Sequence, residues 1–321
     1  MKRVLIVDAL NMYLRSYIIN PTLSSNGSPV GGTVGTLQSL NKLARETKPD
    51  RIIICWDGSG GSQKRKSVNK NYKEGRKPIR LNRAIRNLSE SEEMANKIWQ
   101  QTRLFEYLNE MPIIQIIADG VEADDIISYV ARHPEHKGWQ KVIVSSDKDF
   151  IQLLDDETVL LRPIQKEVLN ATRVVEKFGI HPNNFALARS IVGDKSDNLV
   201  GVGRVGLPTV AKRLPFLSED RDCSIDEVIS FCESVENKLA AHNSIINGRE
   251  IIEQNYKLMQ LYAPSVSIQQ KQSITETLGN FDPMLNKTQI RKMLVEDGIG
   301  EVALSDLFQN FARNISDHNA K

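Results

Sequence analysis

The sequence predicts an α/β fold with a mostly parallel central sheet covered by helices. Short apolar runs rich in β-branched residues recur through the first half of the chain, and stretches with helical periodicity separate them. These runs are apolar at nearly every position, which is typical of strands buried on both faces. We expect strands at 4–7, 52–55, 113–117, 142–144 and 159–161, and helices that include 36–44 and 124–132.

Three of the expected strands end in an aspartate. The first runs into Asp8, the second into Asp57 and the fourth into Asp147. In an open parallel sheet, functional sites form beyond the carboxyl ends of the strands. We therefore expect these three side chains to meet at one edge of the sheet.

A strongly basic segment follows Asp57. Between residues 59 and 86, ten lysines and arginines are opposed by a single acid, Glu74. A run of like charge is most often a solvated helix face, but the position of this one beside Asp57 favours contact with an anion. Near residue 180 the strand pattern stops, and the rest reads mainly as helix and turn. We expect an α/β core at 1–180, with the basic segment inserted at about 59–90, and a helical region at 181–321.

The composition adds a few exclusions. Lys and Arg number 42 against 40 Asp and Glu, so the net charge of +2 does not by itself identify a partner. The three cysteines show no paired spacing, which argues against a disulfide framework or a cysteine-bound zinc site. No apolar stretch approaches the length of a membrane span, and no secretion signal is evident. We expect a soluble, cytoplasmic monomer.

Several further acids come in tight groups at a helix start or in loops. With the strand-end aspartates, they make nine carboxylates: Asp8, Asp57, Glu122, Asp124, Asp125, Asp147, Asp149, Asp194 and Asp197. Each group alone has an ordinary explanation, because Asp often caps helices and Asp-x-Asp often forms turns. Their convergence would be unfavourable unless cations neutralised them, and oxygen ligands without histidine suit Mg²⁺ or Mn²⁺. Two such ions about 3.5–4 Å apart can hydrolyse a phosphodiester, which also fits the basic segment nearby.

Six short motifs, in this order along the chain, resemble those of the flap endonuclease or 5′-nuclease family. They are VDALN at 7–11, WDG at 56–58, YKEGR at 72–76, VEADD at 121–125, SSDKDF at 145–150 and IVGDKSDN at 191–198. The chain is most similar to the stand-alone bacteriophage enzymes of the ribonuclease H type and to the 5′-nuclease domain of bacterial DNA polymerase I. The resemblance implies a PIN-like nuclease core, a helical arch formed by the basic segment, and a helix-hairpin-helix element at about 193–214.

The resemblance also implies a metal-dependent hydrolase with two Mg²⁺ ions, which Mn²⁺ can replace. The inner group of ligands implied is Asp8, Asp57, Glu122, Asp124 and Asp147. Four further acids would complete the second site or act through water: Asp125, Asp149, Asp194 and Asp197. Lys73 and Arg76 would be the catalytic cations that offset charge on the scissile phosphate.

Nucleic-acid contacts are implied in two places. In the arch they are Arg65, Lys66, Lys70 and Tyr72, with the Tyr72 ring stacked on a base. At the hairpin they are Gly201, Gly203, Val205, Gly206, Thr209 and Lys212. Backbone N–H groups of this glycine-rich turn would contact a duplex phosphate, which carries no sequence information. The resemblance also implies K⁺ at the hairpin, although Arg204 stands where relatives carry a glycine.

The activity implied is 5′→3′ exonuclease and flap endonuclease action in replication primer removal. The expected partners are DNA with a 5′ flap, a fork or a 5′ end, or an RNA–DNA hybrid, in the host cytoplasm if the protein is phage-encoded. A sliding clamp or a single-strand-binding protein is the expected protein partner; residues 303–308 resemble a clamp-binding peptide but fit an amphipathic helix better. Two alternatives remain open: a PIN-type endoribonuclease and a non-catalytic protein that binds branched DNA.

Overall fold

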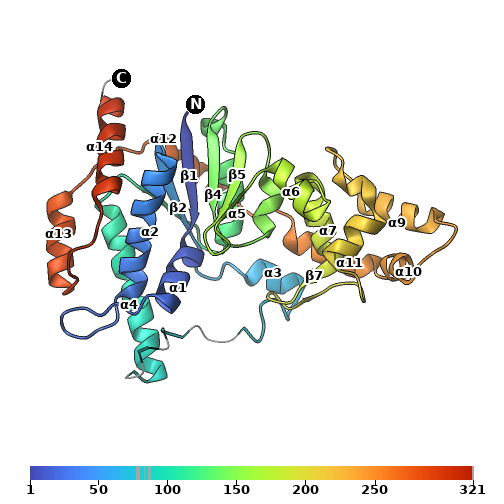
Figure 1. Ribbon diagram of the computed structural model, residues 1–321, viewed down its shortest axis with the longest axis horizontal. Helices are drawn as coiled ribbons and strands as arrows, with labels where there is room; N and C mark the ends of the chain where they lie inside the picture. The colour runs from blue at the N-terminus through green and yellow to red at the C-terminus, as the bar shows by residue number, and fades with distance from the viewer. Residues whose placement is uncertain (77–79, 83, 86–87, 320–321) are drawn as a thin grey trace.

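The computed structural model describes residues 1–76, 80–82, 84–85 and 88–319, and a six-stranded sheet lies at its centre (Figure 1). The strand order is β3-β2-β1-β4-β5-β6, and β6 alone among these six runs antiparallel to its neighbour. The strands are β1 Arg3–Asp8, β2 Arg51–Trp56, β3 Ile114–Ile117, β4 Gln140–Val144, β5 Thr158–Arg162 and β6 Glu167–Leu169.

This sheet confirms the predicted α/β class. All five predicted strands are present, and β6 was not predicted because its three residues are too few to show a strand period. The carboxyl ends of the central strands lie level, because Asp8 pairs with Cys55 on β2 and Val7 pairs with Val144 on β4. The register therefore brings the residues that follow β1, β2 and β4 to one edge.

Alternate residues of the strands face two separate apolar cores. Leu5 and Val7 point into a core with helices α1, α2, α4 and α14 (Ser305–Asn319), whereas Val4 and Ile6 point into a core with α5 and α7. Burial on both faces explains why the strands read as continuous apolar runs. The helices that cover the two faces are α1 Ala9–Ile19, α2 Gly31–Thr47, α4 Glu90–Asn109, α5 Ala123–Ala131, α6 Ala171–Phe178 and α7 Phe185–Val192.

Helices dominate after residue 170, and the two-stranded ribbon of β7 (Gly193–Asp194) and β8 (Leu199–Val200) lies among them. These helices are α8 Leu207–Arg213, α9 Ile225–Ser234, α10 Ala240–Asn247, α11 Arg249–Met259, α12 Ile268–Gly279, α13 Lys287–Glu296 and α14 Ser305–Asn319. In Figure 1, α9, α10 and α11 extend from one end of the molecule, opposite to α13 and α14. Helix α14 packs against α2, on the side of the sheet that Leu5 and Val7 face. Leu307 is buried there, and its N–H donates to the Asn41 side chain of α2 at 2.9 Å.

The predicted division near residue 180 stays a prediction. One apolar core runs from Ile6 in β1 to Ile252 in α11, and α12 and α14 return to the sheet region. Helix α14 begins at Ser305, and Leu304 and Leu307 are buried, which fits the amphipathic interpretation of residues 303–308. No helix in the described ranges has both the length and the apolar character to cross a membrane.

The basic segment contains one short helix among its described residues, α3 Gln63–Val68, and turns follow it. Helix α4 then begins at Glu90 with a capping box, in which Ser89 and Glu92 satisfy each other's backbone N–H groups. Lys77, Arg83 and Arg86, which belong to the predicted arch, lie outside the described residues.

Candidate active site at the carboxyl edge of the sheet

Four aspartates converge where β1, β2 and β4 end. Asp8 caps helix α1, with its carboxylate accepting from the Asn11 N–H at 3.1 Å and from the Ser145 hydroxyl at 2.9 Å. Asp57 accepts from the Ala123 N–H at 2.8 Å, which fixes it against the start of α5. Asp147 follows β4, and Asp124 lies in the first turn of α5. The predicted meeting of the strand-end aspartates is therefore realised, with Asp124 added from a helix.

These four carboxylates influence one another electrostatically. Burial, with the charges of Asp57 and Asp147, raises the pKa of Asp8 to about 7. Burial and the charges of Asp147 and Asp8 hold the pKa of Asp124 well above its usual range. The pKa values of Asp57 and Asp147 are also raised, chiefly by burial. Like charges this close favour protonation of the carboxylates unless cations balance them.

No lysine or arginine in the described ranges forms an ion pair with any of the four aspartates. We call Asp8, Asp57, Asp124 and Asp147 the uncompensated quartet. Within the described part of the chain, no three His, Cys, Asp or Glu side chains are arranged to hold a metal ion as they stand. The donor set nevertheless suits a hard divalent cation, because it consists of carboxylate oxygens that no lysine or arginine of the described ranges pairs with directly.

Glu122 lies apart from this quartet in its bonding. Its carboxylate is 2% exposed and accepts four hydrogen bonds or ion pairs from residues 62–73, which we call the arch base. The donors are Ser62 at 2.5 Å, Arg65 at 2.6 Å, Lys73 at 2.7 Å and Tyr72 at 3.3 Å. Burial opposes ionisation, but the charges of Arg65 and Lys73 outweigh it and lower the pKa of Glu122. Glu122 was expected among the inner metal ligands, and here its oxygens are already engaged.

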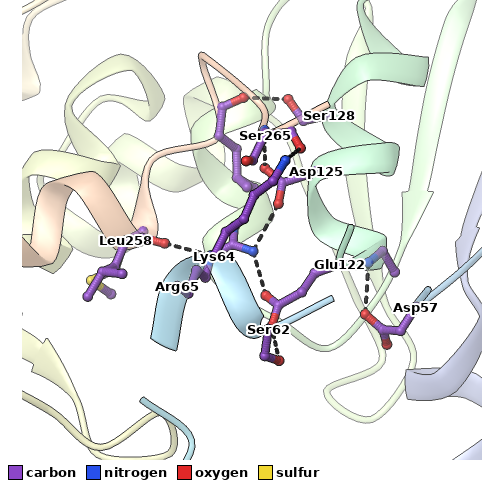
Figure 2. Close-up of polar contacts among 12 residues, drawn as sticks. Asp57, Ser62, Lys64, Arg65, Glu122, Asp125, Ser128, Leu258 and Ser265 are labelled. Carbon is purple, nitrogen blue, oxygen red and sulfur yellow. Dashed lines mark hydrogen bonds and ion pairs between the residues drawn. The ribbon is translucent and has the colours of Figure 1, made fainter. Parts of the chain in front are cut away.

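Arg65 ties this arch base to two other parts of the chain, as Figure 2 shows. The same guanidinium nitrogen that reaches Glu122 also lies 2.9 Å from Asp125, and Arg65 Nε donates to the Leu258 carbonyl at 3.0 Å. The second oxygen of Asp125 accepts from the Ser265 N–H at 2.8 Å. Asp125, expected at the second metal site, thus anchors the segment after α11 to helix α5.

Two residues predicted to contact nucleic acid are enclosed instead. The Arg65 side chain is only 12% exposed and is held by carboxylates and a carbonyl. The Tyr72 ring is buried against Leu199, Leu258 and Met259, so it is not available to stack on a base in this conformation. Sequence reasoning assigned both residues to nucleic acid because they sit in a basic segment. Their partners lie about 50 to 190 residues away in the chain, and no local pattern reveals them.

The three remaining acids also have cationic partners. Arg189 of α7 donates to Asp149 at 3.2 Å and pairs with Asp194, while Arg76 pairs with Asp197. Burial and the Asp147 charge raise the pKa of Asp149 to about 7 despite Arg189. Sequence reasoning missed Arg189. An arginine in the mostly apolar run FALARSIV at 185–192 was the available signal, because a buried guanidinium requires carboxylate partners.

The predicted catalytic cations lie beside these acids. Lys73 has a left-handed backbone with φ of 58°, and its N–H donates to the Asp197 carbonyl at 2.9 Å. Arg76 Nε donates to the Ser196 carbonyl at 3.1 Å, and about half of its side chain is exposed. Both are thus held against the acidic edge from the arch side. Lys66 and Lys70 are exposed, and their contact with nucleic acid stays a prediction.

The hairpin between α7 and α8 is tightly built. A side chain at Gly201 would place its Cβ 2.0 Å from the Val192 carbonyl oxygen, so this position tolerates only glycine. Arg204 has φ of 63°, a left-handed conformation that glycine adopts without strain. Arg204 therefore adopts the backbone conformation that suits the glycine expected at this position from the family pattern. Contacts of Gly203, Val205, Gly206, Thr209 and Lys212 with DNA stay predictions.

A carboxylate cluster at the carboxyl edge of a parallel sheet, with Lys73 and Arg76 beside it, is typical of enzymes that act on phosphate esters with divalent cations. Residues 3–179 match the family described as 5′-3′ exonuclease, N-terminal resolvase-like domain. Because this match spans more than half of the chain, the protein belongs to the 5′-3′ exonuclease family, whose members hydrolyse phosphodiester bonds.

Known relatives agree with this membership. The 5′-3′ exonuclease of Buchnera aphidicola subsp. Schizaphis graminum is 35% identical over 211 residues, which is 65% of this chain and 68% of the relative. Thermostable DNA polymerase I of Thermus filiformis is 29% identical over 213 residues, covering 66% of this chain and 24% of the polymerase. In fold, the chain is similar to the bacteriophage T5 D15 flap endonuclease, solved as a complex with DNA and metal ions. The TM-score is 0.65 at 18% identity, over 92% of this chain and 99% of that one.

Proposed function

We propose that this protein is a structure-specific 5′ nuclease that hydrolyses phosphodiester bonds in branched or 5′-ended DNA with divalent cations. The observation that carries the proposal is the uncompensated quartet at the carboxyl edge of the sheet, with Lys73 and Arg76 on its arch side. Four carboxylates gathered this closely, without a lysine or arginine ion pair in the described ranges, repel one another unless cations bind there. Membership of the 5′-3′ exonuclease family supports the same reaction.

The quartet would hold the inner cations, with Mg²⁺ preferred and Mn²⁺ as a substitute, because its donors are all carboxylate oxygens. Asp149, Asp194 and Asp197 lie next to it and would contribute to a second site once their arginine partners are displaced or shared. When bound, such ions lower the pKa of a water molecule and offset charge on a phosphate. Asp8 and Asp57 are held in place by the N–H groups of Asn11 and Ala123, so their orientation is set before any ion arrives.

Lys73 and Arg76 would bind the scissile phosphate and the phosphate next to it. In the free protein their charges are balanced by Glu122 and Asp197. An entering phosphate would compete with these carboxylates for the same cations, and a charge-assisted contact formed in a dry site is stronger than one in water. Substrate binding would therefore place the phosphate beside the quartet. It would also free Glu122 from Lys73, so that Glu122 could turn toward the quartet.

The proposed substrate is DNA with a 5′ flap, a fork or a free 5′ end, and RNA–DNA hybrid ends are included. The hairpin at 193–214 would contact the duplex part through backbone N–H groups, without reading its sequence. The similar fold of the T5 D15 flap endonuclease, which was solved in a complex with DNA and metal ions, supports this substrate class. Product mapping on a 5′-labelled flap and on an RNA-primed duplex, with Mg²⁺ or EDTA, tests both the cleavage and its polarity.

Replacing one member of the quartet tests the residues themselves. Asp147→Asn keeps the size of the side chain and removes its charge, so we expect flap cleavage in Mg²⁺ to fall by more than about 10²-fold while DNA binding stays measurable. Asp156→Asn is the matched control, because Asp156 is exposed in the loop before β5, at the opposite edge of the sheet, so this variant should cleave like the wild type. Full turnover by Asp147→Asn would reject the quartet as the cation site. Cleavage of unstructured RNA in preference to 5′-ended DNA would favour the endoribonuclease alternative.

A further inference from the structure

A short loop joins the acids expected at the second cation site to the end of the arch base. Residues 194–198, which we call the acidic bridge, run from the end of β7 to the start of β8. Each of its two acids pairs with an arginine: Asp194 with Arg189 of α7, and Asp197 with Arg76. The bridge therefore connects a group of carboxylates with an arginine that is expected to bind phosphate.

Backbone carbonyls of the bridge also hold this part of the chain. The Lys73 N–H donates to the Asp197 carbonyl at 2.9 Å, and Arg76 Nε donates to the Ser196 carbonyl at 3.1 Å. Ser196 in turn donates to one oxygen of Asp194, through its N–H at 2.7 Å and its hydroxyl at 2.6 Å. A movement of the Asp194 carboxylate toward a cation would therefore also move the carbonyl that accepts from Arg76.

The residues before Arg76 provide an anchor and a hinge. The Tyr72 ring is buried, and the Lys73 ammonium lies 2.7 Å from Glu122, so neither side chain is held by the acids of the bridge. Gly75 has φ of 72°, and a Cβ there would meet no atom within 4 Å beyond its chain neighbours. Glycine changes between left-handed and right-handed conformations without a steric cost. Arg76 can therefore turn about Gly75 while Tyr72 stays in place.

A divalent cation would compete for the oxygens that the two arginines now hold. Bound by Asp149, Asp194 and Asp197, it would repel both guanidinium groups. The Arg189 side chain is 11% exposed, whereas that of Arg76 is 52% exposed, so Arg76 is the one that can leave for solvent. A ligand shifts a conformational equilibrium only by its difference in affinity for the two states. Here the difference is direct, because Asp197 cannot give the same oxygen to Arg76 and to a cation.

We propose that Arg76 is a cation-released latch, which Asp197 holds until a divalent cation occupies the second site. The inference rests on the proposed function and adds an order of events to it. The cation arrives first, frees Arg76 from the acidic bridge, and so makes its guanidinium available to a phosphate of the substrate. An enzyme that lacks the cation then keeps this arginine paired with its own acid.

Limited trypsin digestion of the whole chain, without DNA, measures the release of Arg76. Cleavage on the carboxyl side of Arg76 requires its guanidinium to leave Asp197, and the rate of cleavage follows the population of the released form. Rates are compared in EDTA and in Mg²⁺, with the products identified by mass spectrometry. Cleavage after Lys66, which is exposed in α3, is the internal reference in each digest.

Asp197→Ala removes the acid that holds the latch. If Asp197 were only a cation ligand, this change would leave cleavage in EDTA unaltered, so the EDTA rate distinguishes a latch from a ligand. Asp226→Ala is the matched control, because Asp226 also pairs with an arginine, Arg249, at the surface of the helical region. Asp197→Asn, which keeps the size of the side chain, takes the place of Asp197→Ala if circular dichroism shows that the latter is unfolded.

We expect Mg²⁺ to speed wild-type cleavage after Arg76 by roughly fivefold or more, relative to cleavage after Lys66. Asp197→Ala should show the faster rate already in EDTA, with no further response to Mg²⁺, and Asp226→Ala should behave as the wild type. An unchanged or slower wild-type rate, in a preparation that cleaves a 5′ flap in Mg²⁺, would overturn the latch and leave the proposed function standing. An unchanged rate without flap cleavage would overturn both.

Discussion

Replacing Arg189 by methionine should show how much of the acidic site depends on an internal counter-cation. Arg189 is 9% exposed and forms ion pairs with Asp149 and Asp194, whose side chains are 16% and 17% exposed. At about 3 Å and an effective dielectric constant of about 20, one such pair is worth roughly 5 kcal/mol before the desolvation of the guanidinium is subtracted. Removal of one partner from a buried ion pair typically costs about 3–5 kcal/mol, because the other charge stays buried and unbalanced.

We therefore expect Arg189→Met to lower the free energy of unfolding by about 3–5 kcal/mol in EDTA above neutral pH, where both carboxylates are ionised. Excess Mg²⁺ should restore more stability to the variant than it adds to the wild type, because a cation that binds only the folded state stabilises it by mass action. Urea unfolding followed by circular dichroism, in EDTA and in Mg²⁺, measures both quantities.

The control for this experiment is Arg221→Met. Arg221 also joins two carboxylates, Glu219 and Glu227, but all three side chains are solvent-accessible, so little change is expected. A loss below about 1 kcal/mol for Arg189→Met in EDTA would refute the reasoning, since it would mean that Asp149 and Asp194 need no counter-charge. A loss that Mg²⁺ leaves unchanged would show that the effect comes from packing alone.

Three further changes test other features. Arg204→Gly should raise the free energy of unfolding by about 1 kcal/mol, because it relieves a left-handed backbone at an exposed residue; a decrease would refute this. Burial lowers the pKa of His136 to about 4, so the unfolded chain binds more protons than the folded protein between about pH 6.5 and pH 4. The free energy of unfolding should therefore fall by up to about 3 kcal/mol as the pH drops through this range. His136→Gln should flatten that slope in urea unfolding, and an unchanged slope would contradict it. Tyr72→Ala should detach the arch base at a cost of about 3–5 kcal/mol and speed tryptic cleavage at Lys70, whereas Tyr72→Phe should do neither.

Much of the fold follows from local pattern. The continuous apolar runs predicted the parallel strands, and the aspartates at their ends predicted the edge where Asp8, Asp57 and Asp147 meet. This worked because strand direction alone decides where a terminal residue lies. Strand β6 was not predicted, because Glu167–Leu169 begins with a charged residue and is too short to show a strand period.

The charge balance within the site did not follow from the sequence. Glu122 looked like its acidic neighbours, yet it is the one whose oxygens are filled by Ser62, Arg65 and Lys73. Which carboxylate meets a cation depends on side-chain geometry between segments that are far apart in the chain. The burial of Tyr72 could not be predicted for the same reason. The tyrosine was expected to stack on a base, but Leu199 and Leu258 of the helical region bury its ring.

The central place of β1 in the sheet has a consequence for how the protein is made. Its neighbours are β2 on one side and β4 on the other, and Arg3 pairs with Gln140. A ribosome must therefore release more than 140 residues before this strand has both partners. During synthesis, the cations Arg65, Lys73 and Arg76 also emerge before the acids that later balance them, which are Glu122, Asp125 and Asp197. Contacts this distant in sequence slow folding and prolong exposure of unpaired strand edges. We expect the nascent chain to need protection from aggregation and from adventitious RNA during that interval.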